Sequence, residues 1–185
     1  ESLTQDYIIT VSDGQGSSFD QTVTVTLVGS NDAPIANSDS AVLAENESAT
    51  VDAASGVLVN DEDPDTLDTL VVSAIRTGIL SGSGVSAMPG DALQGTYGTL
   101  TLYADGSYDY QANLAAADAL AAGEVATDVF TYTVSDDALT SLNSDAELAF
   151  TITGTNDAPA LLDATQINTT VTELEDGDPS ELTDY

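Results

Sequence analysis

The chain has 185 residues, of which 32 are acidic and one is basic, so its formal net charge at pH 7 is −31. A surface this negative repels nucleic acid and anionic lipid and attracts cations. The sequence has no Cys, no His and no Lys, which excludes disulfides, thiolate or imidazole metal sites, His-based triads, Schiff bases and lysine isopeptide cross-links.

Strong acidity can also indicate disorder, because self-repulsion opposes compaction. Hydrophobic residues make up 42% of this chain, which favours a folded protein. No apolar run reaches the roughly 18 residues of a membrane-spanning helix, and no segment resembles a signal peptide. If the protein is exported, we expect its targeting signal to lie outside these residues.

Two alternating runs fill most of residues 1–32. In YIITV and TVTVTLV, every second residue is apolar, and the apolar positions are Tyr7, Ile9, Val11, Val23, Val25 and Leu27. Thr22, Thr24 and Thr26 occupy the opposite face of the second run. A period of two residues predicts β-strands, here with one polar side each.

The same pair of runs recurs near the end of the chain, as VFTYTVSD at 129–136 and ELAFTITG at 147–154. Both copies contain TVSD, and both end in a similar segment, GSNDAP at 29–34 and GTNDAP at 154–159. We interpret this as a structural repeat. Residues 1–32 would complete a preceding module, 33–158 would form a whole module, and 159–185, with a strand at 166–173, would begin the next.

Between the two copies, TYGTLTLYADGSYDYQ at 96–111 predicts a β-hairpin. Leu100 and Leu102 alternate on one strand, Tyr108 and Tyr110 on the other, and Asp105-Gly106 supplies the positive φ angles of a tight turn. Further strands are expected at 48–53 and 68–76.

One segment, NLAAADALAAGE at 113–124, breaks the alternation. Asn113 as N-cap and Gly123 as C-terminal stop predict a helix of about two turns near 114–122, packed across one end of the sheets. About seven short strands within 33–158 then predict an all-β fold, an antiparallel sandwich of two sheets. A closed barrel stays open as an alternative.

The densest acidic cluster is DEDPDTLD at 61–68, which contains Asp61, Asp63 and Asp65 at alternate positions. Like charges about 4 Å apart repel by about 1 kcal/mol even in water, and a cation relieves that repulsion. Calcium fits best, because it accepts six to eight oxygen ligands in a flexible shell. The spacing is not that of an EF-hand, and a solvated acidic loop without metal is the alternative interpretation.

The position of this cluster in the chain favours the metal site. It follows Asn31-Asp32 by about 30 residues, with Glu45 and Glu47 between them. A chain that descends one strand of a sandwich and then returns brings its next loop back to its starting end. We therefore expect the 61–68 loop to lie beside the Asn31-Asp32 linker.

These motifs resemble those of cadherin-type modules, in which an Asn-Asp-x-x-Pro type linker, a Glu on the first strand and a later Asp-x-Asp loop hold calcium between domains. YGTLTLYADGSYDY, AAGEVATDVFTYTVSD and TITGTNDAP resemble more closely the VCBS and cadherin-like repeats of large bacterial RTX-type adhesins. The resemblance implies an Ig/cadherin-like β-sandwich with Greek-key connections. It also implies a set of calcium ligands: Asn31, Asp32, Asp61, Asp63 and Asp65 at one end, Glu45, Asn156 and Asp157 at the other, and Asp136 as a further ligand.

Two departures from the cadherin pattern are visible. Gly-Ser or Gly-Thr precedes the Asn where cadherins have an acid, and no Asp-Arg-Glu segment occurs. The resemblance therefore implies fewer ions per junction than in a cadherin.

The function implied is that of a calcium-rigidified extender repeat in a secreted or cell-surface adhesin of a Gram-negative bacterium, in adhesion, biofilm or fibre formation. Its partners would be neighbouring repeats, or copies of itself joined end to end. The alternative is a carbohydrate- or ice-binding module, using the threonine row and sugar stacking on Tyr97, Tyr103, Tyr108 and Tyr110. Short loops with no insertion to build a cleft disfavour an enzyme.

Overall fold

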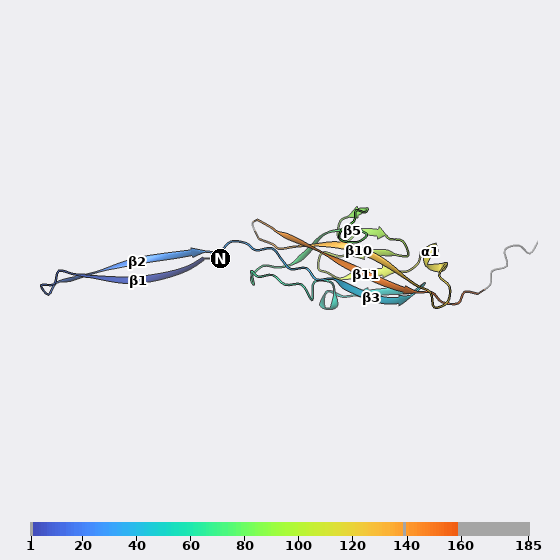
Figure 1. The fold of residues 1–185 in the computed structure, drawn as a ribbon, viewed down its shortest axis with the longest axis horizontal. Coiled ribbons are helices and arrows are strands. Elements are labelled where there is room, and N and C mark those ends of the chain that lie inside the picture. The colour runs from blue at the N-terminus through green and yellow to red at the C-terminus, as the bar shows by residue number, and fades with distance from the viewer. Residues whose placement is uncertain (1, 139, 159–185) are drawn as a thin grey trace, which may run out of the picture.

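A computed structural model describes residues 2–138 and 140–158 (Figure 1). The strand expected at 166–173 lies outside these residues. Strands β1 (Ser2–Ser12) and β2 (Ser18–Val28) form a hairpin that extends away from the other strands, which make up a β-sandwich (Figure 1). Among the described residues, no helix is long and apolar enough to cross a membrane.

The sandwich has one sheet of five strands and one of four. The larger sheet has the order β3 (Asp39–Ala44), β11 (Asn143–Thr153), β10 (Val125–Ser135), β5 (Val71–Thr77) and β6 (Ser86–Ala87). The smaller has the order β4 (Ser48–Val51), β9 (Tyr108–Gln111), β8 (Thr99–Leu102) and β7 (Ala92–Gln94). The predicted all-β fold is confirmed, although β6 and β7 are too short for their periodicity to be visible in the sequence.

Every strand pair of the sandwich is antiparallel except β3 with β11. Ser40 lies opposite Ala149 and Leu43 opposite Ile152, so both strands run in the same direction. Both therefore begin at the end of the domain that receives the linker from β2. This places the start of β3 and the β10–β11 loop at the same end of the molecule.

The core lies between the sheets and follows the predicted alternation. Its largest fully buried side chains are Tyr110, Tyr132, Phe130, Phe150, Ile75, Leu100, Leu102, Leu148, Ile152, Val57, Val72 and Val134. The rings of Tyr110 and Phe150 stack with centroids 3.7 Å apart, and Phe130 and Tyr108 meet Phe150 edge-on. Aromatic pairs of this kind each add about 1 kcal/mol beyond the burial of their area.

Strand β5 departs from strict alternation because of a β-bulge. Ala74 lies opposite Thr133 and Val72 opposite Val134, so Ser73 is the extra residue. The bulge turns Ile75 toward the core together with Val72, three positions earlier, and both are 2% exposed. A bulge of this kind leaves no signature in a single sequence.

The hairpin predicted at 96–111 is present, with Leu100 opposite Tyr110 and Leu102 opposite Tyr108. Its turn is longer than predicted, because the strands are joined by a loop at 103–107. Only Gly106 has a positive φ, of 83°. The Asp105 carboxylate holds the loop by accepting hydrogen bonds from the Ser107 N–H at 3.1 Å and hydroxyl at 2.6 Å.

The predicted two-turn helix is only one turn long. Helix α1 covers Ala115–Asp118, and a second short turn, the 3-10 helix η1, covers Ala53–Ser55. Asn113 does not cap α1, because its side chain donates to Gln111 Oε1 at 3.2 Å. The segment nevertheless buries Ala117 and Leu120, as its low polarity predicted.

A buried carboxylate connects the two sheets near α1. Asp128 on β10 is 3% exposed and accepts hydrogen bonds from the backbone N–H groups of Thr96, Tyr97 and Gly98 at 3.0–3.1 Å. It also accepts the Tyr110 hydroxyl at 3.0 Å. Only glycine fits at position 98, because a Cβ would collide with the Gln111 carbonyl oxygen and with the Tyr110 side chain.

Candidate metal centre

The linker after β2 meets the acidic loop that follows Asn60. Ile35 and Glu62 form an isolated antiparallel bridge, with N···O distances of 2.7 and 3.1 Å. The backbone N–H of Asp32 donates to Asp65 Oδ2 at 2.7 Å. The linker and the loop, which are separated by about 30 residues in sequence, therefore lie side by side.

The loop between β10 and β11 adds a third acidic segment to this end of the sandwich. The Asn31 amide donates to Asp136 Oδ2 at 2.9 Å and to the Thr140 carbonyl at 3.0 Å. Asp136 is 3% exposed. Burial alone raises the pKa of Asp136, but hydrogen bonds from Asn31 and from the N–H groups of Leu142 and Ala138 outweigh it and lower the pKa below its usual value.

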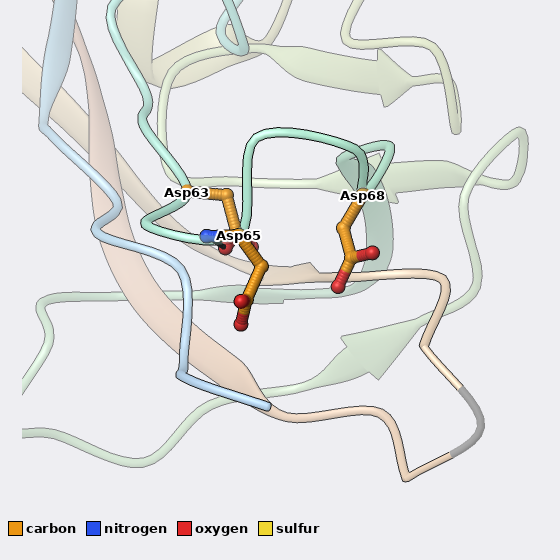
Figure 2. Close-up of side chains that lie close together, drawn as sticks. All are labelled: Asp63, Asp65 and Asp68. Atoms are coloured by element: carbon orange, nitrogen blue, oxygen red, sulfur yellow. Dashed lines mark hydrogen bonds between the residues drawn. The ribbon is translucent and has the colours of Figure 1, made fainter. Parts of the chain in front are cut away.

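Three carboxylates of the acidic loop converge. One oxygen from each of Asp63, Asp65 and Asp68 lies within 4.8 Å of the others (Figure 2). The Asp63 carboxylate accepts the Asp65 N–H at 2.8 Å, which folds the loop back on itself. In Figure 2 the Asp65 and Asp68 carboxylates extend to the same side of the loop.

Asp68 is the member of this cluster that the predicted ligand set did not include. Desolvation raises its pKa, and repulsion from Asp65, Asp137, Asp63 and Asp136 raises it further. Asp137 is held near the cluster because it accepts the Thr69 N–H at 2.8 Å. In the sequence, Asp137 is marked only by its place directly after Asp136. Asp68 is marked only as the last acidic residue of DEDPDTLD.

Asp61 lies in a different environment from the rest of the loop. Its Oδ1 accepts the Asn37 N–H at 2.7 Å, and its Oδ2 is buried without a hydrogen-bond partner. Burial, aided by repulsion from Asp39, raises the pKa of Asp61 to about 6. Asp39 is itself half-buried and accepts the Tyr132 hydroxyl at 2.8 Å.

The remaining predicted ligands lie at the opposite end of the sandwich from the acidic loop. The two ends are separated by the length of β11, about 35 Å. Glu45 is 2% exposed, and its Oε1 accepts hydrogen bonds from the N–H and the hydroxyl of Thr155. Its Oε2 is buried without a partner. Asn156 and Asp157 follow Thr155 as exposed residues, and the Asn156 side-chain amide donates to the Asp157 carbonyl at 3.4 Å.

The available donor atoms suit a hard cation. All the groups gathered at both ends are carboxylate, amide or backbone oxygens, which calcium prefers. Among the described residues, three buried side-chain oxygens lack a hydrogen-bond partner, and they belong to Glu45, Asp61 and Asp63, all predicted ligands. A buried acceptor without a partner costs about 1–3 kcal/mol, so each of the three has capacity for a cation or a water.

Two of the four tyrosines considered for sugar stacking are buried, whereas Tyr103 is 40% exposed. Tyr108 and Tyr110 are in the core, 7% and 0% exposed, so they offer no face to a ligand. In the threonine row of β2, the Thr24 hydroxyl donates to Asp6 at 2.6 Å across the hairpin. Those tyrosines follow the general tendency of hairpin aromatics to pack inward.

Comparison with known proteins gives a matching family model and matches among solved structures. No curated protein matches the sequence. One similar solved structure is a nucleoside hydrolase-related hypothetical protein from Saccharophagus degradans, associated with carbohydrate metabolism, at 16% identity and a TM-score of 0.38. The match covers 66% of this chain and 26% of that one. The bacterial cadherin-like domain matches residues 31–154, most of the chain and nearly all of the sandwich. The chain therefore belongs to the family of bacterial cadherin-like domains.

Proposed function

We propose that the protein is a calcium-rigidified extender module of a secreted or cell-surface bacterial adhesin, of the VCBS type found in large RTX adhesins. Bacterial cadherin-like domains are structural and adhesive modules and not enzymes. The observation that carries the proposal is the contact of the Asp32 N–H with Asp65 Oδ2, which joins the linker directly to the Asp63, Asp65 and Asp68 cluster.

The physical role of calcium follows from the charges at this junction. Desolvation is the largest cause of the raised pKa of Asp68, and repulsion from Asp65, Asp137, Asp63 and Asp136 raises it further when no cation is bound. A divalent cation bound by Asp63, Asp65 and Asp68 would turn this repulsion into attraction. Because Asp32 lies against Asp65, the same ion would restrain the linker and hence the angle between the modules that it joins.

Glu45 supports a second junction at the other end. Its partner Thr155 lies in the repeat of the linker motif, one residue before Asn156-Asp157. The buried Oε2 of Glu45, which has no hydrogen-bond partner, is available to a cation at the exit of the domain. Each module would then be joined to its neighbours at both ends, which converts a chain of hinges into a rod suited to extracellular calcium concentrations.

A thermal calcium titration tests the proposal. If a site binds calcium with a Kd of about 0.1 mM, 10 mM calcium stabilises the folded domain by about 2.7 kcal/mol. For a domain of this size, that corresponds to a rise in Tm of about 10 °C. Magnesium should produce a much smaller rise, because it requires stricter geometry and retains its water ligands.

Matched variants locate the effect. Asp65→Asn should remove the part of the calcium-dependent rise that comes from the ion at the linker, whereas Asp118→Asn, which removes the same charge from α1 at the far end of the domain, should retain it. Small-angle scattering with calcium and with chelator should show a more extended, less variable particle with calcium. Equal melting temperatures in calcium and chelator, or equal responses of the two variants, would refute the assignment.

A further inference from the structure

The hairpin β1–β2 has the same construction as β10–β11. All four strands have 11 residues. Ser2 lies opposite Val28 and Ser12 opposite Ser18, just as Val125 lies opposite Thr153 and Ser135 opposite Asn143. The strands of the two hairpins therefore correspond residue by residue, although the loops that join them, 13–17 and 136–142, differ in length, and each hairpin is followed by the Asn-Asp-Ala-Pro linker.

The matching registers place the apolar face of the exposed hairpin at the positions that form the core in the other hairpin. Tyr7, Ile9, Val11, Val23, Val25 and Leu27 occupy the positions of Phe130, Tyr132, Val134, Leu148, Phe150 and Ile152. The six residues on β10 and β11 are at most 1% exposed, whereas those on β1 and β2 are 39–62% exposed. An apolar face of this size on a two-stranded hairpin is not stable alone in water, and it indicates a missing partner.

Both outer edges of the hairpin are also without partners. In the sandwich, β5 pairs with the outer edge of β10 and β3 with that of β11. Within the residues that the structure describes, β1 and β2 pair only with each other. The occupant must therefore provide strands on two edges as well as a sheet over the apolar face.

A second copy of residues 31–124 fits this position poorly. At the position of Phe150, whose ring stacks on Tyr110 and meets Phe130 and Tyr108 edge-on, the hairpin has Val25. At the position of Asp128, which accepts four buried hydrogen bonds, it has Gln5. If β1–β2 took the place of β10–β11, Val25 would leave a void and Gln5 would leave hydrogen-bond donors unpaired. The occupant therefore has larger side chains opposite Val25 and a different arrangement of polar groups opposite Gln5.

A dimer of two hairpins, apolar face to face, is also a poor solution. It would cover the faces but leave all four outer strand edges unpaired, and unpaired edges invite further association. The identical register with β10–β11 favours an occupant that covers faces and edges together.

From this construction we infer that β1–β2 is the closing hairpin of a second cadherin-like sandwich, whose remaining strands belong to the same polypeptide on the N-terminal side of the hairpin. This inference depends on packing and strand register and not on calcium. Residues 1–28, which the family match does not include, are then the last part of a neighbouring module, and the Asn31-Asp32 linker joins two complete sandwiches.

Hydrogen exchange tests the inference on two chains, the 185-residue chain and the native polypeptide extended N-terminally by the stretch equivalent to residues 31–124. Amides of Tyr7, Ile9, Val23 and Val25 should exchange at least 100-fold more slowly in the extended chain. Val25→Asp should lower the first unfolding transition of that chain and leave the transition of residues 31–158 unchanged. Thr26→Asp, which adds the same charge on the opposite face of β2, should change neither.

Four results would overturn the inference. One is equal, fast exchange of the hairpin amides in both chains, and a second is a native protein in which no such stretch precedes the hairpin. Another is protection in the 185-residue chain that rises with concentration alongside a dimer in light scattering, which would identify a second copy as the occupant. The last is protection in the 185-residue chain that disappears when residues 159–185 are removed, which would identify that segment.

Discussion

Removal of the buried Asp128 carboxylate should destabilise the sandwich far more than removal of a surface carboxylate with a similar partner. Asp128 accepts four hydrogen bonds, from the N–H groups of Thr96, Tyr97 and Gly98 and from the Tyr110 hydroxyl. In Asp128→Ala, the exposed Thr96 N–H can bind water, but the Gly98 N–H and the Tyr110 hydroxyl are buried and stay unpaired.

The expected loss in the free energy of unfolding follows from the buried donors that are left without an acceptor. At about 1–3 kcal/mol for each buried donor without a partner, Asp128→Ala should lower the free energy of unfolding by about 4 kcal/mol. In Asp128→Asn, the remaining oxygen can still accept the three donors that now bind Oδ2, while the new amide group faces the N–H of the exposed residue Thr96. This variant should therefore lower the free energy of unfolding by only about 1–2 kcal/mol. The typical stability of a domain is 5–15 kcal/mol, so the alanine variant should still fold in buffer.

Urea denaturation at a fixed calcium concentration measures these changes. Asp109→Ala is the matched control, because Asp109 also accepts a tyrosine hydroxyl, from Tyr103 at 3.2 Å, but at the surface. It removes the same charge and should cost less than about 1 kcal/mol. If Asp128→Ala and Asp109→Ala cost the same, the argument that burial of the hydrogen bonds decides the cost is wrong.

Three further predictions concern the acidic loop and the hairpin at 96–111. Because burial raises the pKa of Asp61 to about 6, the folded chain keeps a proton that the unfolded chain releases, so calcium-free stability should rise by about 1 kcal/mol as pH falls from 7 to 5. Asp61→Asn should reduce this rise in a thermal series over pH; an unaltered pH response would contradict it. Asp68→Asn should raise the calcium-free Tm and weaken the calcium response, because it removes both a repelling charge and a calcium ligand. A lower calcium-free Tm would show that repulsion at Asp68 does not destabilise the fold. Gly98→Ala should cost about 2 kcal/mol in urea denaturation with an unchanged m-value, since its Cβ would collide with the Gln111 carbonyl oxygen and with the Tyr110 side chain; a neutral result would show that β9 and the Tyr110 ring can both move aside.

Local patterns in the sequence determined much of the fold. Alternation of apolar residues in YIITV, TVTVTLV, VFTYTVSD and ELAFTITG placed four strands and their inner faces, because every second side chain of a strand lies on the same side. The pairing of Leu100 and Leu102 with Tyr110 and Tyr108 followed from the same rule and a nearby glycine. The repeated Asn-Asp-Ala-Pro motif and the return of the chain to its starting end indicated that the linker meets the 61–68 loop.

Other features depended on contacts between distant residues, and local patterns do not encode those. The bulge at Ser73, the parallel pairing of β3 with β11 and the single-turn α1 are set by the strands against which they pack. The separation of Asp61 from Asp63 and Asp65 depends on Asn37 and Asp39, more than 20 residues away. The burial of Asp128 and Asp136 likewise depends on Gly98 and Asn31, 30 and 105 residues away. A carboxylate in a sequence looks the same whether it is solvated or enclosed, and only the tertiary structure determines how many donors surround it.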